Sequence, residues 1–165
     1  MELDAVYFAA SYEMEAEGED SENGEYFDLF ASTEFAGLTL GAAYQNATPS
    51  IGAEDFDTWG VSASYDFDIA SIGADYSVTD ETNVQAEQTL LNVVTTFDVA
   101  STTGVALGMR NYDEDVTGFE DITEWYANVT YKFPVAKNVR LFAEIADTDA
   151  DDADMGYLAG LRVKF

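Results

Sequence analysis

Cysteine and histidine are both absent from this chain of 165 residues. Their absence excludes disulfide bonds, zinc sites built from Cys and His, thiol nucleophiles, Ser-His-Asp triads and haem ligation by histidine. Lysine and arginine number only 6 against 33 aspartates and glutamates, so the formal net charge is −27. Because proteins that bind nucleic acid need clustered cations, this charge excludes a nucleic-acid partner.

Long apolar runs are also missing, and no segment approaches the roughly 18 apolar residues of a membrane-spanning helix. Met1 is followed at once by Glu2 and Asp4, without the basic and apolar regions of a secretory signal. We therefore expect a mature form or a piece of a longer chain. Proline is scarce, at 2 residues, whereas 47% of the residues are hydrophobic and 14% aromatic. A chain of this composition is expected to fold.

The dominant pattern is an alternation of apolar and polar residues with period two, which is typical of strands with two different faces. Ten segments show it: 6–12, 27–35, 38–44, 59–67, 70–78, 91–97, 105–109, 125–133, 139–145 and 157–165. The sixth is less regular, because Leu90 and Val94 fall on its polar side. The regular segments are 5 to 9 residues long. With the residues that flank them, we expect strands of roughly ten residues, which match the 9–11 that a tilted transmembrane strand needs.

The connections alternate between short turns and long acidic loops. The short ones are Ala36-Gly37, Asp68, Val99 to Thr103 and Pro134 to Asn138. The long ones are Glu13 to Glu25, Asn46 to Thr58, Thr79 to Gln88, Asp113 to Asp121 and Asp147 to Asp154. This asymmetry is that of outer-membrane barrels, which have short periplasmic turns and long extracellular loops. An even number of strands then places both termini on the periplasmic side.

Aromatic residues stand at the ends of the apolar rows and alanines in their middle. Phe35, Phe67 and Phe133 lie at short-turn ends, and Trp59 and Trp125 at long-loop ends. Two membrane interfaces select this arrangement. We therefore predict that residues 1–165 form a single all-β domain, an antiparallel up-and-down transmembrane β-barrel of about ten strands. A soluble acidic β-sandwich is the alternative that the alternation alone leaves open.

Three segments resemble Gram-negative outer-membrane porins of the general-diffusion class: Trp59 to Phe67, Gly104 to Tyr112 and Tyr157 to Phe165. The last segment resembles the family's assembly signal, with Gly160, Val163 and Phe165 at the matching positions. The resemblance implies recognition by the barrel-assembly machinery, contact with outer-membrane lipid and lipopolysaccharide, and a homotrimer. Members usually have about sixteen strands, a signal peptide and a constriction loop with a Pro-Glu-Phe-Gly-Gly-Asp-like motif, and no such motif occurs in this sequence. The chain is thus either the C-terminal ten strands of a larger porin or a reduced, complete barrel.

Charges of both signs alternate with the apolar rows and are expected to face the barrel interior. The predicted pore-lining residues are Arg110, Arg140, Arg162, Lys132, Asp66, Asp75, Glu124 and Glu144. They indicate a channel for passive diffusion of small hydrophilic solutes and ions, in which the acidic loops favour cations. The alternative is a structural scaffold whose lumen is filled by these side chains, since ten strands enclose little more space than eight.

One acidic loop matches part of a calcium-binding motif. Asp147, Asp149 and Asp151 occupy the first three ligand positions of an EF-hand, but Asp152 and Leu158 replace its Gly and its bidentate Glu. We interpret the loop as a solvated acidic surface, with loose binding of Ca²⁺ or Mg²⁺, or bridging to lipopolysaccharide phosphates, as the alternative. No other cofactor is predicted. Outer-membrane proteases and phospholipases of similar strand number use a histidine, so no enzymatic activity is predicted.

Overall fold

The computed structural model describes residues 5–14, 16–18, 21–48, 55–81, 87–118, 120–151 and 153–164. These residues form strands and turns only, as predicted. No helix within the described ranges is long and apolar enough to cross a membrane.

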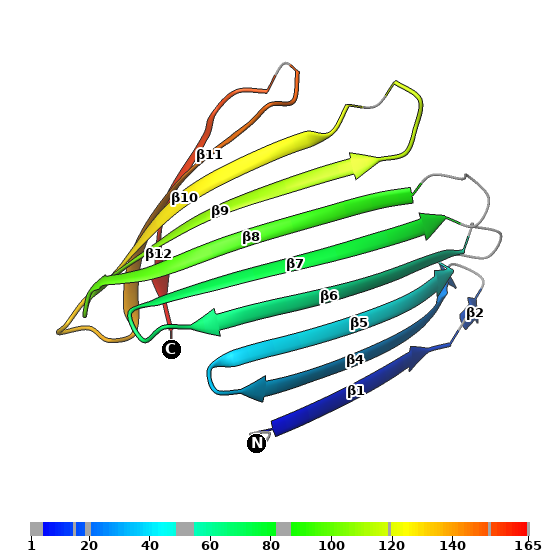
Figure 1. Cartoon of the computed structure of the whole chain (residues 1–165), viewed down its shortest axis with the longest axis horizontal. Helices are drawn as coiled ribbons and strands as arrows, with labels where there is room; N and C mark the ends of the chain where they lie inside the picture. Colours follow the sequence, from blue (N-terminus) through cyan, green and yellow to red (C-terminus); the bar gives the residue numbers. More distant parts are fainter. Residues whose placement is uncertain are drawn as a thin grey trace.

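Ten strands form one antiparallel sheet in which spatial order follows chain order, as Figure 1 shows. They are β1 (Ala5–Glu13), β4 (Glu25–Phe35), β5 (Leu38–Thr48), β6 (Phe56–Asp66), β7 (Ala70–Glu81), β8 (Glu87–Ala100), β9 (Thr103–Glu114), β10 (Ile122–Lys132), β11 (Val139–Thr148) and β12 (Gly156–Val163). Such an order is the up-and-down topology of barrels. Within the part of the chain that the structure describes, β1 and β12 are the two edges and do not pair, so the sheet is open.

Two of the short turns use backbone conformations that suit their residues. Ala36 and Gly37 join β4 to β5 with φ of 49° and 82°, which is the pattern of a two-residue hairpin that matches the twist of the strands. Asp68 joins β6 to β7 with φ of 71°, and its N–H donates to Asp66 Oδ1 at 2.8 Å. Both turns lie where the sequence predicts them.

The long connections differ from the expectation, because the strands continue into them. β5 extends to Thr48 and β6 begins at Phe56, so the loop between them is shorter than predicted. The first acidic loop holds a separate hairpin, formed by β2 (Ala16–Gly18) and β3 (Ser21–Asn23). These extensions are mostly polar. Side-chain hydrogen bonds, such as that from Asn46 Nδ2 to Asp57 Oδ1 at 3.0 Å, add to the main-chain pairing of β5 with β6. The polar residues leave no hydrophobic alternation to read in the sequence.

The register places all ten apolar rows on one face of the sheet. Residues that pair across an antiparallel ladder point to the same side. Phe8 on β1 pairs with Ala31 on β4, Ala31 with Ala42 on β5, and Ala42 with Val61 on β6. The same holds across the remaining strands to Leu161 on β12. The alternating polar residues therefore share the opposite face.

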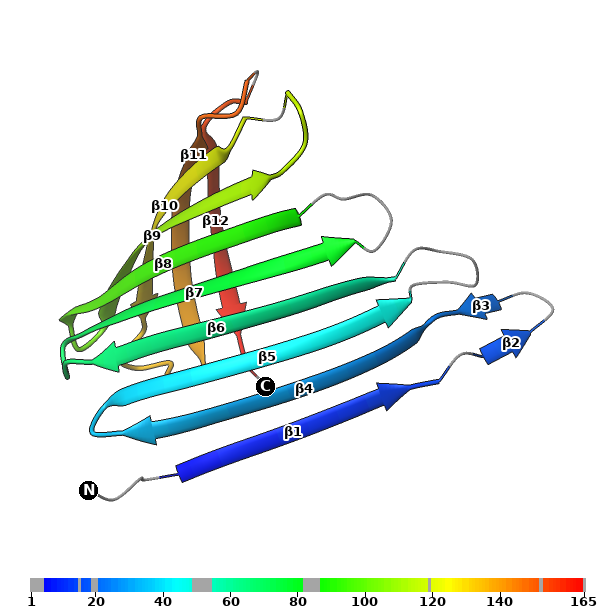
Figure 2. The same ribbon diagram turned by 45° about the vertical axis from the view of Figure 1, so that its right-hand side comes forward.

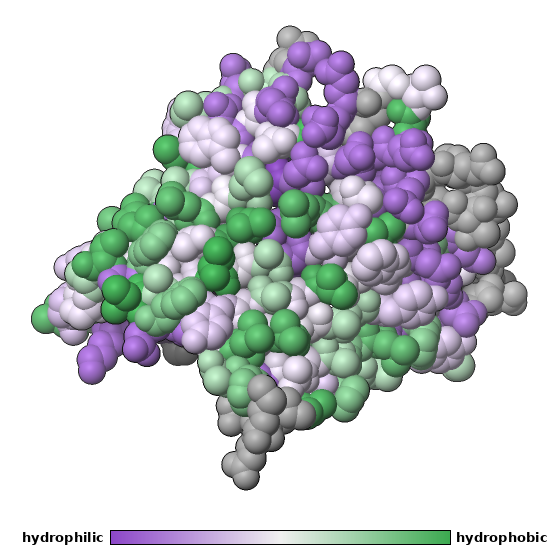
Figure 3. Space-filling view, viewed as in Figure 1, coloured by the Kyte–Doolittle hydropathy of each residue, from purple (hydrophilic) through white to green (hydrophobic). Residues whose placement is uncertain are grey.

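The sheet is a single curved layer. In Figures 1 and 2 the sheet curls beyond β10, so that β11 and β12 pass behind the strands in front and Figure 1 looks onto the convex side. Figure 3 shows apolar residues spread over this convex side and hydrophilic ones gathered toward the long loops. Contacts between strands occur only between sheet neighbours among the described residues. The β-sandwich interpretation is therefore wrong, because no second layer covers the apolar face.

Burial is consequently slight, and the apolar face is exposed. Only Ala47 and Val78 are buried among the described hydrophobic residues, whereas Leu107 and Ile145 are 49% and 45% exposed. A soluble protein does not leave such a large apolar face in water. This face needs hydrocarbon as its surroundings.

Aromatic pairs on the convex face lie toward the two ends of the strands. Trp59 and Tyr76 meet edge to face near the long loops, with ring centroids 5.9 Å apart. At the short-turn end, the rings of Tyr131 and Phe133 are 5.1 Å apart. Small residues such as Ala42 lie between these ends. This is the arrangement of aromatic girdles around an apolar band.

Candidate pore-lining face

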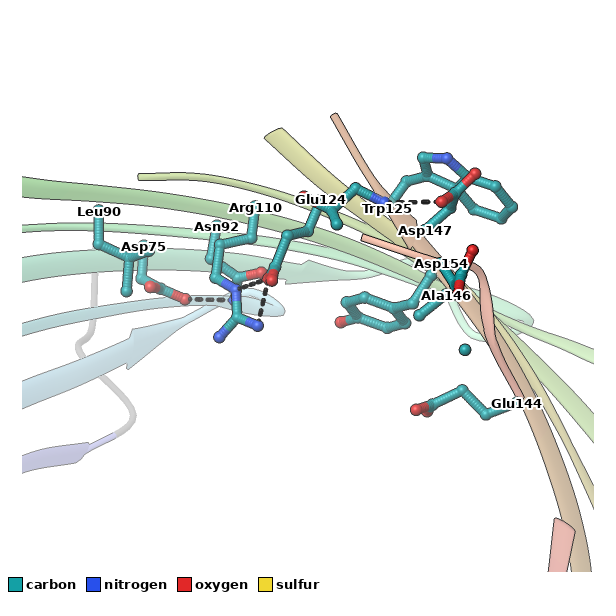
Figure 4. Close-up of a pocket in the computed structure, with 13 residues that line it drawn as sticks. Asp75, Leu90, Asn92, Arg110, Glu124, Trp125, Glu144, Ala146, Asp147 and Asp154 are labelled. Atoms are coloured by element: carbon teal, nitrogen blue, oxygen red, sulfur yellow. Dashed lines mark hydrogen bonds and ion pairs between the residues drawn. The ribbon is translucent and has the colours of Figure 1, made fainter. Parts of the chain in front are cut away.

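The polar side of the sheet is concave and carries an open hollow of about 560 Å³. Its lining comes from β7 to β12: the polar-face members are Asp75, Leu90, Asn92, Arg110, Glu124, Tyr126, Glu144, Ala146, Thr148 and Gly156. In Figure 4 the side chains of Arg110 and Glu144 project into the concave side, while the Trp125 ring lies across the sheet from them. Four of the predicted pore-lining residues thus face one space: Asp75, Arg110, Glu124 and Glu144.

A polar row crosses four neighbouring strands through this cavity. Asp75, Asn92, Arg110 and Glu124 are successive register partners on β7, β8, β9 and β10. Asn92 Nδ2 donates to Asp75 Oδ1 at 3.0 Å, and Arg110 Nε donates to Glu124 Oε2 at 2.6 Å. Arg110 and Glu124 also form an ion pair. The row therefore consists of two hydrogen-bonded pairs of neighbouring side chains, and Arg110 and Glu124 remain accessible to solvent.

The remaining predicted carboxylates lie in one other register row. Asp66 on β6 and Glu144 on β11 belong to the same row but are separated by the four strands between them. Asn128 Nδ2 donates to Glu144 Oε2 at 3.5 Å. Asp66 instead accepts the N–H of Asp68 and supports the turn. The sequence therefore predicts the shared face of these residues but not their separation.

The predicted cations of the last strands come together at the short-turn end. Lys132 on β10 pairs with Arg140 on β11, and Arg140 pairs with Arg162 on β12. Arg140 and Arg162 line a second cavity, of about 660 Å³. The concave face therefore has two parts. Toward the long loops, carboxylates surround Arg110, and at the short-turn end three cations form a row.

Two aromatic rings on the concave face lie over glycines, and neither was predicted as lining. A Cβ added to Gly108 on β9 would be 2.0 Å from Tyr126 Cζ on β10. A Cβ added to Gly160 on β12 would be 2.5 Å from Phe142 Cζ on β11. Glycine opposite an inward aromatic ring leaves room for that ring to lie flat on the neighbouring strand. The sequence signal that could have indicated these contacts is an aromatic residue at a position of the polar face, Tyr126 or Phe142, together with a glycine on the neighbouring strand.

The residues of the assembly signal lie on and beyond the last strand. Gly160 faces the Phe142 ring on the concave side, and Val163 pairs with Val139 on the convex side. Phe165 lies outside the described residues. Recognition by the assembly machinery stays a prediction.

The loop aspartates do not form a compact ligand set. Asp149 Oδ1 accepts the N–H of Thr123 at 2.6 Å, and Asp147 Oδ1 accepts the N–H of Thr148 at 3.0 Å. Asp151 lies near Asp149 along an acidic depression of about 410 Å³. No cluster of three metal-ligating side chains is found in the described ranges. Loose binding of Ca²⁺ or Mg²⁺ stays a prediction.

Comparison with known proteins yields both a sequence family and structural neighbours. The family model described as Gram-negative porin matches residues 2–153. Porin-like protein H of Photobacterium profundum is 26% identical over 120 residues, covering 67% of this chain and 36% of that protein. A solved structure of porin superposes with a TM-score of 0.81 at 21% identity, over 100% of this chain and 60% of the other.

A second structural neighbour is OmpT of Vibrio cholerae. Its in-vitro folded form has a TM-score of 0.72 at 23% identity, covering 90% of this chain and 52% of OmpT. A trimer form of OmpT gives a TM-score of 0.69. At these identities the likeness shows the fold. The chain spans 36% of the curated relative and 60% of the solved porin.

Proposed function

This chain belongs to the Gram-negative porin family, and we propose that it forms the wall of a channel through which small hydrophilic solutes and ions diffuse passively. Family membership gives the outer membrane as its location. We further propose that the start of β1 and the end of β12 lie on the periplasmic side of the membrane. The family and fold are those of channels, and we expect no catalytic activity.

The observation that carries the proposal is the division of the sheet into two faces. The convex face is apolar and unpacked, which suits contact with lipid. The concave face carries the polar row from Asp75 to Glu124, with two hydrogen-bonded pairs, and borders an open hollow. Polar side chains that keep access to water along a curved wall are what a diffusion pore requires.

We further propose that the channel prefers cations. The described long-loop ends are rich in exposed carboxylates, among them Asp113, Asp115, Glu120, Asp121 and Asp151. A single-sign field at a pore mouth raises the local concentration of counter-ions. The preference should therefore weaken with salt, because the Debye length falls from about 30 Å at 0.01 M to about 3 Å at 1 M.

Planar-bilayer recordings on the reconstituted full chain test both parts. A potassium chloride gradient should give stepwise currents with a reversal potential of cation-selective sign, and raising the salt should move that potential toward zero. Anion-selective steps would overturn the cation preference alone. Folded protein that passes no current, and no sugars in liposome swelling, would instead favour the scaffold with a side-chain-filled lumen.

The oligomeric state is a further proposal. One structure of the neighbour OmpT is a trimer form, and the apolar convex face leaves ample surface for contact between subunits in the membrane. We propose a homotrimer, with lipid and lipopolysaccharide covering the rest of that face. Crosslinking in native membranes should give a ladder that ends at three subunits.

A further inference from the structure

Three cations stand side by side at the short-turn end of the concave face. Lys132, Arg140 and Arg162 are successive register partners on β10, β11 and β12. Neighbouring strands lie about 4.8 Å apart, so the backbone positions of the three span only about 10 Å. Like charges directly opposite one another destabilise a sheet. A row of three therefore opposes folding unless an anion lies against it.

The chain supplies no such anion among the residues that the structure describes. Arg110, nearer the long loops on the same face, forms its ion pair with Glu124. Lys132, Arg140 and Arg162 have no side-chain hydrogen bond or ion pair with any described residue. The chain has 33 carboxylates and only 6 cations, so a charged residue next to a cation would by chance be acidic far more often than basic. Arg110 follows this expectation, whereas Lys132, Arg140 and Arg162 lie next to one another.

A cavity of about 660 Å³ opens beside the row. Arg140, Arg162, Asn128 and Thr130 contribute polar groups to it, and Phe142 contributes a ring. Glu144 is the one carboxylate in its lining. This residue lies four positions from Arg140, or about 13 Å along the strand, and accepts a hydrogen bond from Asn128. Glu144 therefore leaves the charge of the row uncompensated.

We infer that Lys132, Arg140 and Arg162 form a binding site for a multiply charged oxyanion of the phosphate class. Guanidinium groups bind such oxygens in a bidentate fork, and the ammonium adds a compact point charge. Attraction grows with the product of the charges, so a phosphate is favoured over chloride. The inference rests on the proposed function in one respect, since the concave face must be filled with water. Lipid headgroups contact the convex side, so the ligand is a dissolved solute.

Calorimetric titration of the full chain, folded in uncharged detergent at constant ionic strength, tests this site without measuring current. Inorganic phosphate and pyrophosphate are the probes. Arg140→Gln and Arg162→Gln should each weaken pyrophosphate binding by about tenfold or more, because each removes a charge-assisted contact. Lys137→Gln removes the same charge from the turn before β11 and should change affinity by less than about twofold.

Two results would overturn the inference: absence of pyrophosphate binding to the wild-type chain, or equal weakening by Lys137→Gln and Arg140→Gln. A channel that binds pyrophosphate but passes no current would remove the proposed function and leave the site. Thermal unfolding provides the folding control. Pyrophosphate should raise the Tm of the wild type and not that of Arg140→Gln, and Arg162→Lys, which keeps the charge without the fork, should lie between them. Equal rises in all variants would contradict the site.

Discussion

Arg110 on β9 donates from Nε to Oε2 of Glu124 on β10 at 2.6 Å, and the two residues are direct register partners. Their side chains are 52% and 40% exposed. An ion pair this exposed contributes little to stability, with a median of about 0–1 kcal/mol. Its main effect is therefore on the electrostatic potential of the concave face, where it cancels one carboxylate in an otherwise acidic cavity.

Arg110→Gln should raise the cation-to-anion permeability ratio by about twofold, because Glu124 and Asp75 then act without a nearby cation. Glu124→Gln should lower the ratio for the opposite reason. Reversal potentials in a salt gradient measure both. Stability in urea should change by less than about 1 kcal/mol in either variant, and a shift of the ratio in the same direction for both variants would contradict the lumenal role of the pair.

Gly108→Ala should destabilise the folded chain by about 1–3 kcal/mol, the usual cost of overpacking, since the new methyl would meet Tyr126 Cζ at 2.0 Å. The ring must then swing off the wall into the cavity. Urea titration of the detergent-folded chain measures the loss. Gly73→Ala is the matched control, because Gly73 shares the register row of Gly108 through Val94 and its nearest contact would be an ordinary 3.5 Å.

The Gly108→Ala loss should largely disappear in a Tyr126→Ala background, where no ring occupies the space above the glycine. A double-mutant cycle gives this coupling directly. A loss that persists undiminished without the ring would show that the glycine serves the backbone and not the aromatic contact.

The ten long strands and their short turns could be read from the sequence because their causes are local. Apolar alternation such as Trp59, Val61, Ala63 and Tyr65 fixes the two faces, and Ala36-Gly37 fixes a turn. The hairpin of β2 and β3 could not be read, because acidic residues without alternation give no signal for strands held by main-chain hydrogen bonds.

The sequence predicts which residues lie on the concave face, but not which of them are neighbours there. Each charge on that face follows from its position in a strand, but neighbours across strands depend on the register of several ladders at once. The register of the folded sheet was therefore needed to show that Arg110 pairs with Glu124. It was also needed to show that Lys132 lies beside Arg140, and Arg140 beside Arg162. The Tyr126 ring escaped prediction because it breaks the polar pattern that defines the face.

Ala36→Asn should stabilise the chain by about 0.5–1 kcal/mol, because Ala36 has φ of 49° and asparagine tolerates this left-handed conformation better than alanine. Gly37→Val, at φ of 82°, should destabilise it by at least as much. Unfolding in urea measures both. Equal stability of all three chains would show that this hairpin does not retain its turn in the folded protein.

Val61→Arg should impair membrane insertion, since Val61 lies on the convex face at the middle of β6 and is 50% exposed. An arginine at the bilayer midplane costs about 2–4 kcal/mol in a barrel. Ser62→Arg adds the same side chain one residue later, on the concave face, and should insert normally. Urea unfolding in lipid vesicles measures the difference, and an inverted order would contradict the assignment of the faces.

A single-cysteine scan along β6 from Trp59 to Asp66 tests the two-faced wall most directly, because the chain contains no cysteine of its own. Spin labels attached at each position in lipid vesicles report contact with oxygen, which concentrates in hydrocarbon, and with a water-soluble nickel complex. Labels at Trp59, Val61, Ala63 and Tyr65 should favour oxygen, and labels at Gly60, Ser62, Ser64 and Asp66 should favour nickel. The opposite alternation, or none, would contradict a channel wall with lipid outside and water inside.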